Sequence, residues 1–471
     1  MDFPIYHLDL MGNRLLVAVI AILHVLINHG LAVGLIPLVA AMEWYGARKG
    51  DPRWDRLARR ILFFAFLITT TVGALTGVGI WLSTSLVNPA SIGSLIRVFF
   101  WGWFIEWLVF ITEVVLILWY HLTWESWQGA RKAAHIRLGF ALAVFSWVTM
   151  AIIVSILGFM MDPGNWLTDH SLWSGFTNPI YLPQLAFRTA LALCFAAMVA
   201  LMLILFFTRR DDPFRYQAVR AVSVFALATG PFVVLAGWWY ASVVPETMLA
   251  NLATGLATMQ FEEWQDRLFL GMIGAAALVM GVAQLGVWRP HWVPRLGLLV
   301  PLVAVMWLTG HFERVREFIR KPYVIGQYMY ANGLRVEDYP LYQSKGLLPY
   351  ATWTYPLSQA ETAAIPAGAS VTDVQAGKDV FMIACTRCHT ANGVNAVRGH
   401  FQRMLGDDPW TPDKTMDTLA YMHEARPFMP PFPGSPAELA QVALYIQTLQ
   451  SVTEPLAGAQ SAGVKLREEA R

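Results

Sequence analysis

Cysteine and charged residues are both scarce in this sequence. Only 3 of the 471 residues are Cys, so no disulfide framework is indicated. Charged residues make up 14% and the formal net charge is +2, which argues against a nucleic-acid-binding protein. In contrast, 56% of the residues are hydrophobic, with 20 Trp and 27 Phe. Ordinary soluble domains do not have this composition, so we expect an integral membrane protein.

Several motifs of redox and nucleotide-binding proteins are missing as well. No apolar segment carries two His thirteen or fourteen residues apart, the spacing that stacks two haems in quinol:cytochrome c reductases. No two His are adjacent, which argues against a copper–haem site. No Walker or GxGxxG motif stands in a suitable context. The first ten residues lack a basic region followed by a cleavage site, so we expect the first apolar segment to direct insertion.

Eight apolar segments are long enough to cross about 30 Å of hydrocarbon. They are 15–42, 61–86, 98–122, 134–161, 185–208, 219–243, 268–288 and 293–308. Because backbone groups in lipid must be hydrogen-bonded internally, we expect these segments to be helices. The predicted fold is therefore all-α, with a polytopic bundle of about eight transmembrane helices.

The distribution of Lys and Arg predicts the orientation of the bundle. The connections after the odd-numbered segments carry fifteen Lys and Arg, whereas those after segments two, four and six carry only Arg97 and Arg267. Basic loops stay in the cytoplasm. We therefore expect the N-terminus and everything after residue 308 on the periplasmic side of a bacterial cytoplasmic membrane.

Near its C-terminal end the sequence contains the motif Cys385-Thr386-Arg387-Cys388-His389, the attachment signature of a c-type haem. Two thiols at this spacing bond one haem, and His389 is the proximal iron ligand. A zinc site would need further ligands, and the only other cysteine is Cys194. Haem c is attached on the outer side of the bacterial membrane, which agrees with the orientation predicted from Lys and Arg.

The flanks of this motif resemble a class I cytochrome c domain over about the last 95 residues. A short helix is expected over 375–384 and another over 435–449, where Ser435 and Pro436 start an apolar stripe. Between them, Met429 lies in a Pro-rich loop. The resemblance implies that Met429 is the sixth iron ligand, with His400 or His423 as alternatives.

Ionisable residues inside apolar segments are usually functional. The first segment carries His24 and His29, which lie about 140° apart on a helix and cannot share a face. We expect one of them, preferably His24, to bind a haem iron; otherwise each is a hydrogen-bonded core residue. His311, at the end of the eighth segment, is an equal candidate for a ligand or a surface residue. His121 and His135 flank a charged loop and are expected to lie at the membrane interface.

The third segment carries Glu106 and Glu113, two helical turns and about 10 Å apart on one face. Two acids on a buried face suggest a proton path or a haem-facing carboxylate. The alternative is a structural pair, neutralised by protonation or by an Arg such as Arg188.

Four stretches within residues 15–326 resemble subunit I of cytochrome bd-type quinol oxidases. They are 24–43 with its Met42-Glu43 pair, 104–113 with its two Glu, 158–163 (GFMMDP) and 317–326, where RKPY resembles an Arg-Gln-Pro-Trp turn. The resemblance implies that the His of the first segment binds a high-spin haem and that Glu106 and Glu113 belong to the haem and proton-supply region. It also implies that His311 replaces a Glu that binds the second high-spin haem.

The sequence departs from that family in three places. Arg188 stands where the family has the His of its low-spin haem, and Met272 is the only candidate for the partner Met. The outer loop that shapes the quinol site is reduced to 244–267. A haem c domain has been added.

These features predict a membrane-bound respiratory oxidoreductase that passes electrons between one covalent haem c and two buried haems of b or d type. We favour oxygen reduction with cytochrome c as the donor. The alternatives are a quinol or quinone oxidoreductase that exchanges electrons with a periplasmic partner, and a non-enzymatic electron-conducting membrane anchor. A further integral membrane subunit is expected as a partner. We expect a membrane bundle at 1–326, an extracytoplasmic linker at 327–372, a cytochrome c domain at 373–451 and a disordered tail at 452–471.

Overall fold

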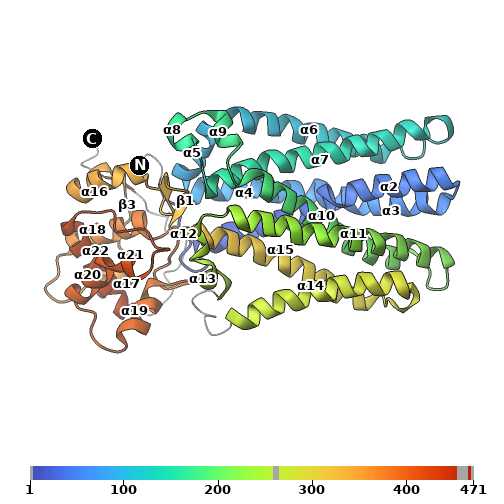
Figure 1. Cartoon of the computed structure of the whole chain (residues 1–471). Helices are drawn as coiled ribbons and strands as arrows, with labels where there is room; N and C mark the ends of the chain where they lie inside the picture. Colours follow the sequence, from blue (N-terminus) through green and yellow to red (C-terminus); the bar gives the residue numbers. More distant parts are fainter. Residues whose placement is uncertain (1–3, 258–264, 453–464, 468–471) are drawn as a thin grey trace. The chain divides into compact units, whose positions relative to one another are not determined.

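The structure, a computed structural model, describes residues 4–257, 265–452 and 465–467. The chain forms two compact units. The bundle unit comprises Ala21–Val78 and Val98–Ile319, and the C-terminal unit comprises Met1–Ile20, Gly79–Arg97 and Arg320–Arg471. Almost all regular structure is helical, as predicted (Figure 1).

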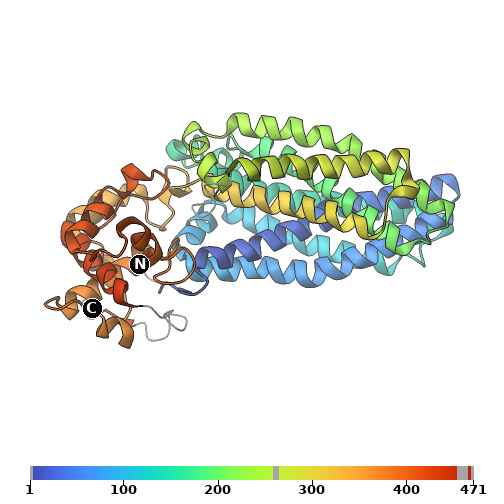
Figure 2. The ribbon, with the colours of Figure 1, turned by 90° about the horizontal axis from the view of Figure 1, so that it is seen from below.

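Long helices that run side by side build the bundle unit (Figures 1 and 2). The long helices and the π-helical turns between them are α1 (Asn13–Ile27), η1 (Asn28–Val33), α2 (Leu35–Lys49), α3 (Pro52–Ile68), η2 (Thr69–Gly73), α4 (Ala74–Val87), α6 (Phe100–Leu122), α7 (Lys132–Met161), α10 (Tyr181–Phe207), α11 (Pro213–Val243), α14 (Gln265–Trp288) and α15 (Leu299–Ile319). Short helices complete it: η3 (Gly129–Arg131), α8 (Trp166–Asp169), α9 (Leu172–Phe176), α12 (Glu246–Leu249), α13 (Leu252–Ala257), η5 (Pro290–Trp292) and η6 (Leu296–Leu298). The first residues of α1 and the last of α4 belong to the C-terminal unit.

Seven helices of the described residues are long and apolar enough to cross a membrane. They correspond to the first seven predicted segments. Of the eighth predicted segment, 293–308, only residues 299–308 lie in α15, and this helix is not among the seven. The last turns of α15 carry Glu313, Arg314, Arg316 and Glu317. We expected His311 at the end of its helix. It lies inside α15 instead, because α15 continues to Ile319.

Two of the long helices begin in the same way. Asp51 and Asp212 are the N-caps of α3 and α11, and each carboxylate accepts a hydrogen bond from the backbone N–H two residues later. A Pro follows each Asp, where its missing N–H costs nothing.

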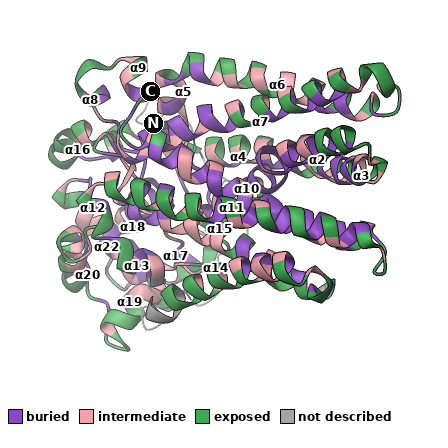
Figure 3. Ribbon diagram, turned by 45° about the vertical axis from the view of Figure 1, so that its right-hand side comes forward, coloured by how far each residue is buried: buried purple, intermediate pink, exposed green. Residues whose placement is uncertain are grey.

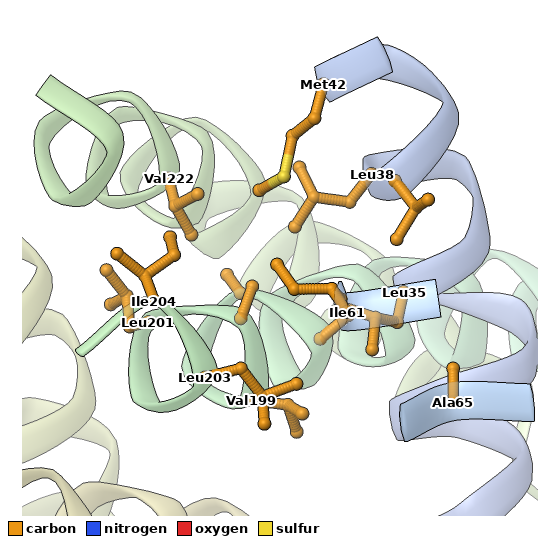
Figure 4. Packing of buried hydrophobic residues seen from close by; sticks show 14 of the residues in the cluster. Leu35, Leu38, Met42, Ile61, Ala65, Val199, Leu201, Leu203, Ile204 and Val222 are labelled. Atoms are coloured by element: carbon orange, nitrogen blue, oxygen red, sulfur yellow. The ribbon is translucent and has the colours of Figure 1, made fainter. Parts of the chain in front are cut away.

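The core of the bundle lies around α10, which packs against α11, α7, α15, η1 and α2. Apolar side chains of α2, α3, α10 and α11 meet there, among them Leu35, Ile61, Ile204 and Val222 (Figure 4). In contrast, α6 is largely exposed, since only Gly102, Ile117 and Tyr120 of this helix are buried, whereas most residues of α10 are buried (Figure 3). We conclude that α10 is the central helix and that α6 faces lipid or another chain.

The C-terminal unit contains shorter elements. They are α5 (Pro89–Val98), β1 (Tyr323–Ile325), β2 (Met329–Tyr330), η7 (Val336–Asp338), α16 (Tyr339–Lys345), η8 (Leu348–Tyr350), β3 (Trp353–Thr354), α17 (Gln359–Ala363), α18 (Val371–Ala384), α19 (Val397–Leu405), α20 (Pro412–Ala420), α21 (Met422–Ala425), α22 (Pro436–Ser451) and β4 (Lys465–Leu466). Strands β1 and β2 pair antiparallel, as do β3 and β4. Helices α18 and α22 cross closely at Gly377, where a Cβ atom would lie 2.0 Å from the Gln441 carbonyl oxygen.

Residues 327–372, which we expected to form an extended linker, are packed into this unit. Leu334, Tyr339, Leu347 and Tyr355 share one buried core with residues of α18 and α22. In the tail expected to be disordered, 453–464 and 468–471 lie outside the described residues, while 465–466 form β4.

The N-terminal segment also folds onto this unit. The Asp9 carboxylate accepts a hydrogen bond from Ala391 N (2.7 Å), and the Tyr355 hydroxyl accepts one from Ile5 N (2.8 Å). Val394 N donates to the Leu10 carbonyl (3.1 Å). Residues 4–12 are therefore held by the C-terminal domain.

Candidate functional site

The CxxCH motif begins where α18 ends. Cys385 is the C-cap of α18, and its carbonyl accepts hydrogen bonds from Cys388 N (3.1 Å) and His389 N (2.9 Å). This single turn brings the two cysteines together as free thiols. Burial raises the pKa of the Cys385 thiol to about 12, so it stays protonated. A turn that gathers two thiols and a His fits covalent attachment of one haem.

His389 is held in one orientation. Its Nδ1 donates to the Asn395 carbonyl (3.1 Å), which leaves Nε2 as the ligating atom. Asn395 adopts a positive φ of 57° and donates from Nδ2 to the Cys388 carbonyl (2.8 Å). Burial, and then the neighbouring His400, lower the pKa of His389 to about 4. The ring is therefore neutral, as an iron ligand must be.

The three candidates for the sixth ligand differ in their contacts. Both ring nitrogens of His400 are engaged, with Asn395 Oδ1 (2.8 Å) and an Arg403 guanidinium nitrogen (2.9 Å). His423 donates from Nδ1 to the Met429 carbonyl (2.5 Å), which holds the loop that carries Met429. Met429 is half-buried. These contacts favour Met429 over His400, and its ligand role stays a prediction.

In the bundle unit, His24 projects from α1 towards the turn between α3 and α4. Its Nδ1 lies 3.2 Å from the Gly73 carbonyl and 3.2 Å from Thr76 Oγ1. Gly73 ends the π-helix η2, and a π-helical turn is often found at a functional site. A donor bond from Nδ1 to a carbonyl fixes the tautomer in which Nε2 carries the free lone pair. His24 therefore fits a haem iron as a single axial ligand.

His29 faces a different helix, as the predicted rotation requires. It lies in η1, is 3% exposed, and its Nε2 accepts a hydrogen bond from Arg188 of α10 at 3.3 Å. That bond uses the lone pair a metal would need. Of the two predicted ligands, the contacts favour His24.

Arg188 does not neutralise the acids of the third segment. Its guanidinium lies 2.6 Å from Glu313 Oε1 of α15, and Glu313 Oε2 accepts from Arg316 Nε at 3.1 Å. All three side chains are buried. Arg188 also lies over the Phe312 ring, 5.3 Å from its centroid. A buried ion-pair cluster thus surrounds Arg188, the residue that stands where the resemblance implies the His of a low-spin haem.

The two acids of α6 have different surroundings. Glu113 accepts hydrogen bonds from Ser146 Oγ (2.6 Å) and Thr149 Oγ1 (3.3 Å), both on α7. Glu106 is half-buried, two helical turns away. Hydroxyl groups beside a carboxyl can pass a proton or hold a neutral acid.

His311 lines a pocket of about 430 Å³ between α15 and α1. Its ring stacks on Trp307 (4.8 Å), and its Nε2 accepts from Arg314 at 2.9 Å. Ile22 lines the same pocket from α1, whereas His24 contacts η2 and α4. His311 and His24 therefore belong to separate sites.

Sequence reasoning missed two buried groups. The first is Glu313. Its pairing with Arg188 had a signal in the sequence, because each is a charged residue within or next to an apolar segment. The second is Glu43, which lies 2.5 Å from His135 Nδ1 and accepts from Tyr120 Oη at 2.6 Å. His135 is fully buried, so the expectation that it lies at the interface is wrong, because Glu43 and the Tyr120 carbonyl satisfy both ring nitrogens.

The donors fit haem rather than a bare metal ion. Among the described residues, no group of three or more His, Cys, Asp or Glu is placed to hold a metal. A porphyrin supplies four iron ligands itself, so one or two axial side chains are enough.

Comparisons with known proteins agree with this arrangement. The family described as cytochrome bd terminal oxidase subunit I matches residues 13–267, more than half of the chain. The family described as cytochrome c oxidase, cbb3-type, subunit III matches residues 372–446. Among curated proteins, none matches the sequence.

A solved structure is also similar to this chain. It is the bd oxidase from Geobacillus thermodenitrificans, with 17% identity and a TM-score of 0.53. The similarity covers 68% of this chain and 88% of that one, and it confirms the predicted helical fold. This chain belongs to the family of cytochrome bd terminal oxidase subunit I, and it carries a cytochrome c domain in its C-terminal part.

Proposed function

We propose that this protein is an oxygen reductase of the respiratory chain that takes electrons from a periplasmic cytochrome c. Its bd oxidase-like bundle and its cytochrome c domain make it a respiratory haem electron-transfer protein. The observation that carries the proposal is that Cys385, Cys388 and His389 fold in one unit with residues 320–323, which directly follow α15. The chain that leaves α15 therefore enters the unit that holds the haem attachment site.

The chain's residues have these roles. Cys385 and Cys388 hold haem c, with His389 and Met429 as iron ligands. His24 Nε2 holds one buried haem of b or d type. His311 is the predicted ligand of a second, and its Nε2 binds iron only when the hydrogen bond from Arg314 is broken. When bound, haem supplies iron that takes up single electrons and binds oxygen. Ser146 and Thr149 orient the Glu113 carboxyl, and Glu106 and Glu113 carry protons along α6.

The cluster at Arg188 supports cytochrome c as the donor. The family resemblance implies a low-spin, quinol-side haem with a His ligand in the fifth segment. Arg188 cannot serve as that ligand, since it is positively charged and bonded to Glu313 and His29. A chain without that haem needs another entry for electrons, and haem c provides one.

One observation favours the alternative function, quinol or quinone oxidation and reduction. The pocket at His311 is lined mainly by apolar side chains, of which Val303 is 61% exposed and Met306 38% exposed. An apolar pocket open on the side of a membrane helix with His311 and Arg314 among its lining suits a lipid-soluble ring compound.

We further propose the setting of the protein. The distribution of Lys and Arg supports an N-terminus and a haem c domain on the periplasmic side of the cytoplasmic membrane. The binding of residues 4–12 by the C-terminal unit supports the same side for both. The exposed aromatic face of α6, with Trp101, Phe104 and Trp107, supports a second integral subunit that covers it.

The test is oxygen uptake by the purified complex, with reduced cytochrome c and with quinol as separate donors. We expect uptake with cytochrome c. Uptake with quinol alone would support the alternative, and uptake with neither would leave a membrane anchor. A third, low-spin b haem with His and Met ligands in the anaerobic spectrum would contradict the proposal.

Haem content tests the assignment of His24. We expect His24→Ala to lose one membrane haem and to keep haem c, measured as pyridine haemochromes. His121→Ala is the matched control, because His121 is half-buried and its ring lies against those of Phe63 (5.6 Å) and Phe66 (5.0 Å). Equal membrane haem content in both variants would rule out His24 as a ligand.

A further inference from the structure

Lys321 lies beside the haem attachment site. It is the second residue after α15, and its Nζ donates to Cys388 Sγ at 3.2 Å. Its side chain is buried, with 9% of the residue exposed. Both residues belong to the C-terminal unit. A buried ammonium group thus contacts one of the two sulfurs that bond the porphyrin.

The chain after Lys321 is held in place. Ala331 N donates to the Pro322 carbonyl (2.8 Å), and β1 pairs with β2. The Tyr323 and Tyr330 rings stack at 5.0 Å, and the Tyr330 and Tyr339 rings lie 4.5 Å apart. Because these contacts fix the backbone near Lys321, the ammonium group stays near Cys388.

A second basic residue lies in the attachment motif itself. Arg387, within the motif, is half-buried and donates to the Ile383 carbonyl (2.5 Å). Two basic side chains therefore stand at the attachment site, and Lys321 is the buried one.

We propose that Lys321 sets the reduction potential of haem c, by holding a positive charge that favours the reduced, ferrous state. Reduction adds one electron to the ferric iron and forms or breaks no covalent bond. A fixed cation lowers the free energy of the state with one more negative charge. Burial keeps salt from screening this interaction. Lys321 acts on the haem through its charge beside the Cys388 sulfur and is not proposed as an iron ligand.

This inference rests on the proposed function, which places haem c at the entry of electrons. A higher potential makes haem c a better acceptor from a soluble donor. The segment that supplies the charge is also the first to leave the last long helix, so the potential depends on correct packing of that segment.

The experiment is a spectroelectrochemical titration of haem c in the full-length protein. Lys321→Met and Lys321→Gln remove the charge, and Lys321→Arg keeps it. We expect both neutral variants to lower the ratio of reduced to oxidised haem c about tenfold at a given potential, a shift of about 59 mV. Lys345→Met is the control, because Lys345 is exposed, and it should leave the potential unchanged.

The haem c potentials of the three Lys321 variants distinguish an effect of the Lys321 charge from an effect of its packing. If Lys321→Arg shifted as much as Lys321→Met, shape and not charge would be responsible, and the proposal would be wrong. An unchanged potential in both neutral variants with full haem c content would also overturn it. That outcome leaves the proposed function intact if the wild type still reduces oxygen with cytochrome c.

Discussion

At the scale of single residues, the most consequential feature of the bundle is the cluster of Arg188, Glu313, Arg316 and His29. Burying charged groups costs several kcal/mol per ion unless they are paired. One carboxylate here contacts two guanidinium groups, and His29 accepts a further bond. The cluster joins α10, α15 and η1, so its members depend on one another.

Removing the carboxylate should therefore be costly. We expect Glu313→Gln to lower the free energy of unfolding by about 3–5 kcal/mol, because it removes the carboxylate that pairs with the buried Arg188 and leaves the buried Arg316 with only the more distant Glu317 (3.9 Å). Thermal unfolding in detergent measures this. Asp51→Asn is the control: Asp51 pairs with Arg53, whose side chain is 42% exposed, and Asn also caps a helix, so little change is expected. Similar losses in both variants would contradict the role of the cluster.

At the scale of helices, the bundle depends on a close approach at Gly34, between η1 and α2. A Cβ atom there would lie 2.2 Å from the Ala192 carbonyl oxygen and 2.6 Å from Ala196 Cβ, both on α10. The central helix can therefore approach this turn only because the residue is Gly.

Gly34→Ala should push α10 away from this turn. Overpacking of this kind costs about 1–3 kcal/mol, and more when backbone must move. Gly281→Ala on α14 is the matched control, since its Cβ would meet nothing within 4 Å. We expect a lower melting temperature for Gly34→Ala only, and equal melting temperatures would count against the close packing.

In the C-terminal unit, Glu438 does more than cap its own helix. It completes the capping box of α22 with Ser435 and also accepts hydrogen bonds from Leu347 N (2.8 Å) and Leu348 N (2.7 Å). These two donors are far away in the sequence, in the segment expected to be a linker. Glu438 therefore fastens that segment to the cytochrome c helices.

We expect Glu438→Ala to destabilise the C-terminal unit by about 2–3 kcal/mol, because it leaves buried backbone N–H groups without acceptors. Ser435→Ala removes only the cap and should cost about 1 kcal/mol. Thermal unfolding of the full-length protein, followed by the absorption of haem c, compares the two. A larger loss of stability in Ser435→Ala than in Glu438→Ala would show that the hydrogen bonds from Leu347 and Leu348 are unimportant.

At the scale of the whole molecule, residues from the N-terminus, from the α4–α5 region and from the C-terminal part fold into one unit. The proposed topology puts all three on the periplasmic side. A cysteine at Leu10, which is 70% exposed, should react with a membrane-impermeant maleimide in intact cells. A cysteine at the exposed Lys49 should react only after lysis. Labelling of Lys49→Cys in intact cells would overturn the topology.

Local patterns predicted well those features that depend on local chemistry. The haem attachment motif, the long apolar helices and the opposite faces of His24 and His29 follow from spacing alone. Arg188 and Glu313 are 125 positions apart, and Glu43 and His135 are 92 apart, so their pairing depends on how helices pack. The π-helical turns at η1 and η2 have no sequence signal that helical periodicity could show. The supposed linker was misjudged because its Tyr and Leu residues are buried only through long-range contacts.

The docking of residues 4–12 imposes an order on biogenesis. This segment is synthesised long before Tyr355, Ala391 and Val394, which bind it. While the residues between are being made, it has none of these partners. Its capture therefore requires the cytochrome c part, so a chain that stalls or is cut before Tyr355 would leave residues 4–12 unbound and open to proteases.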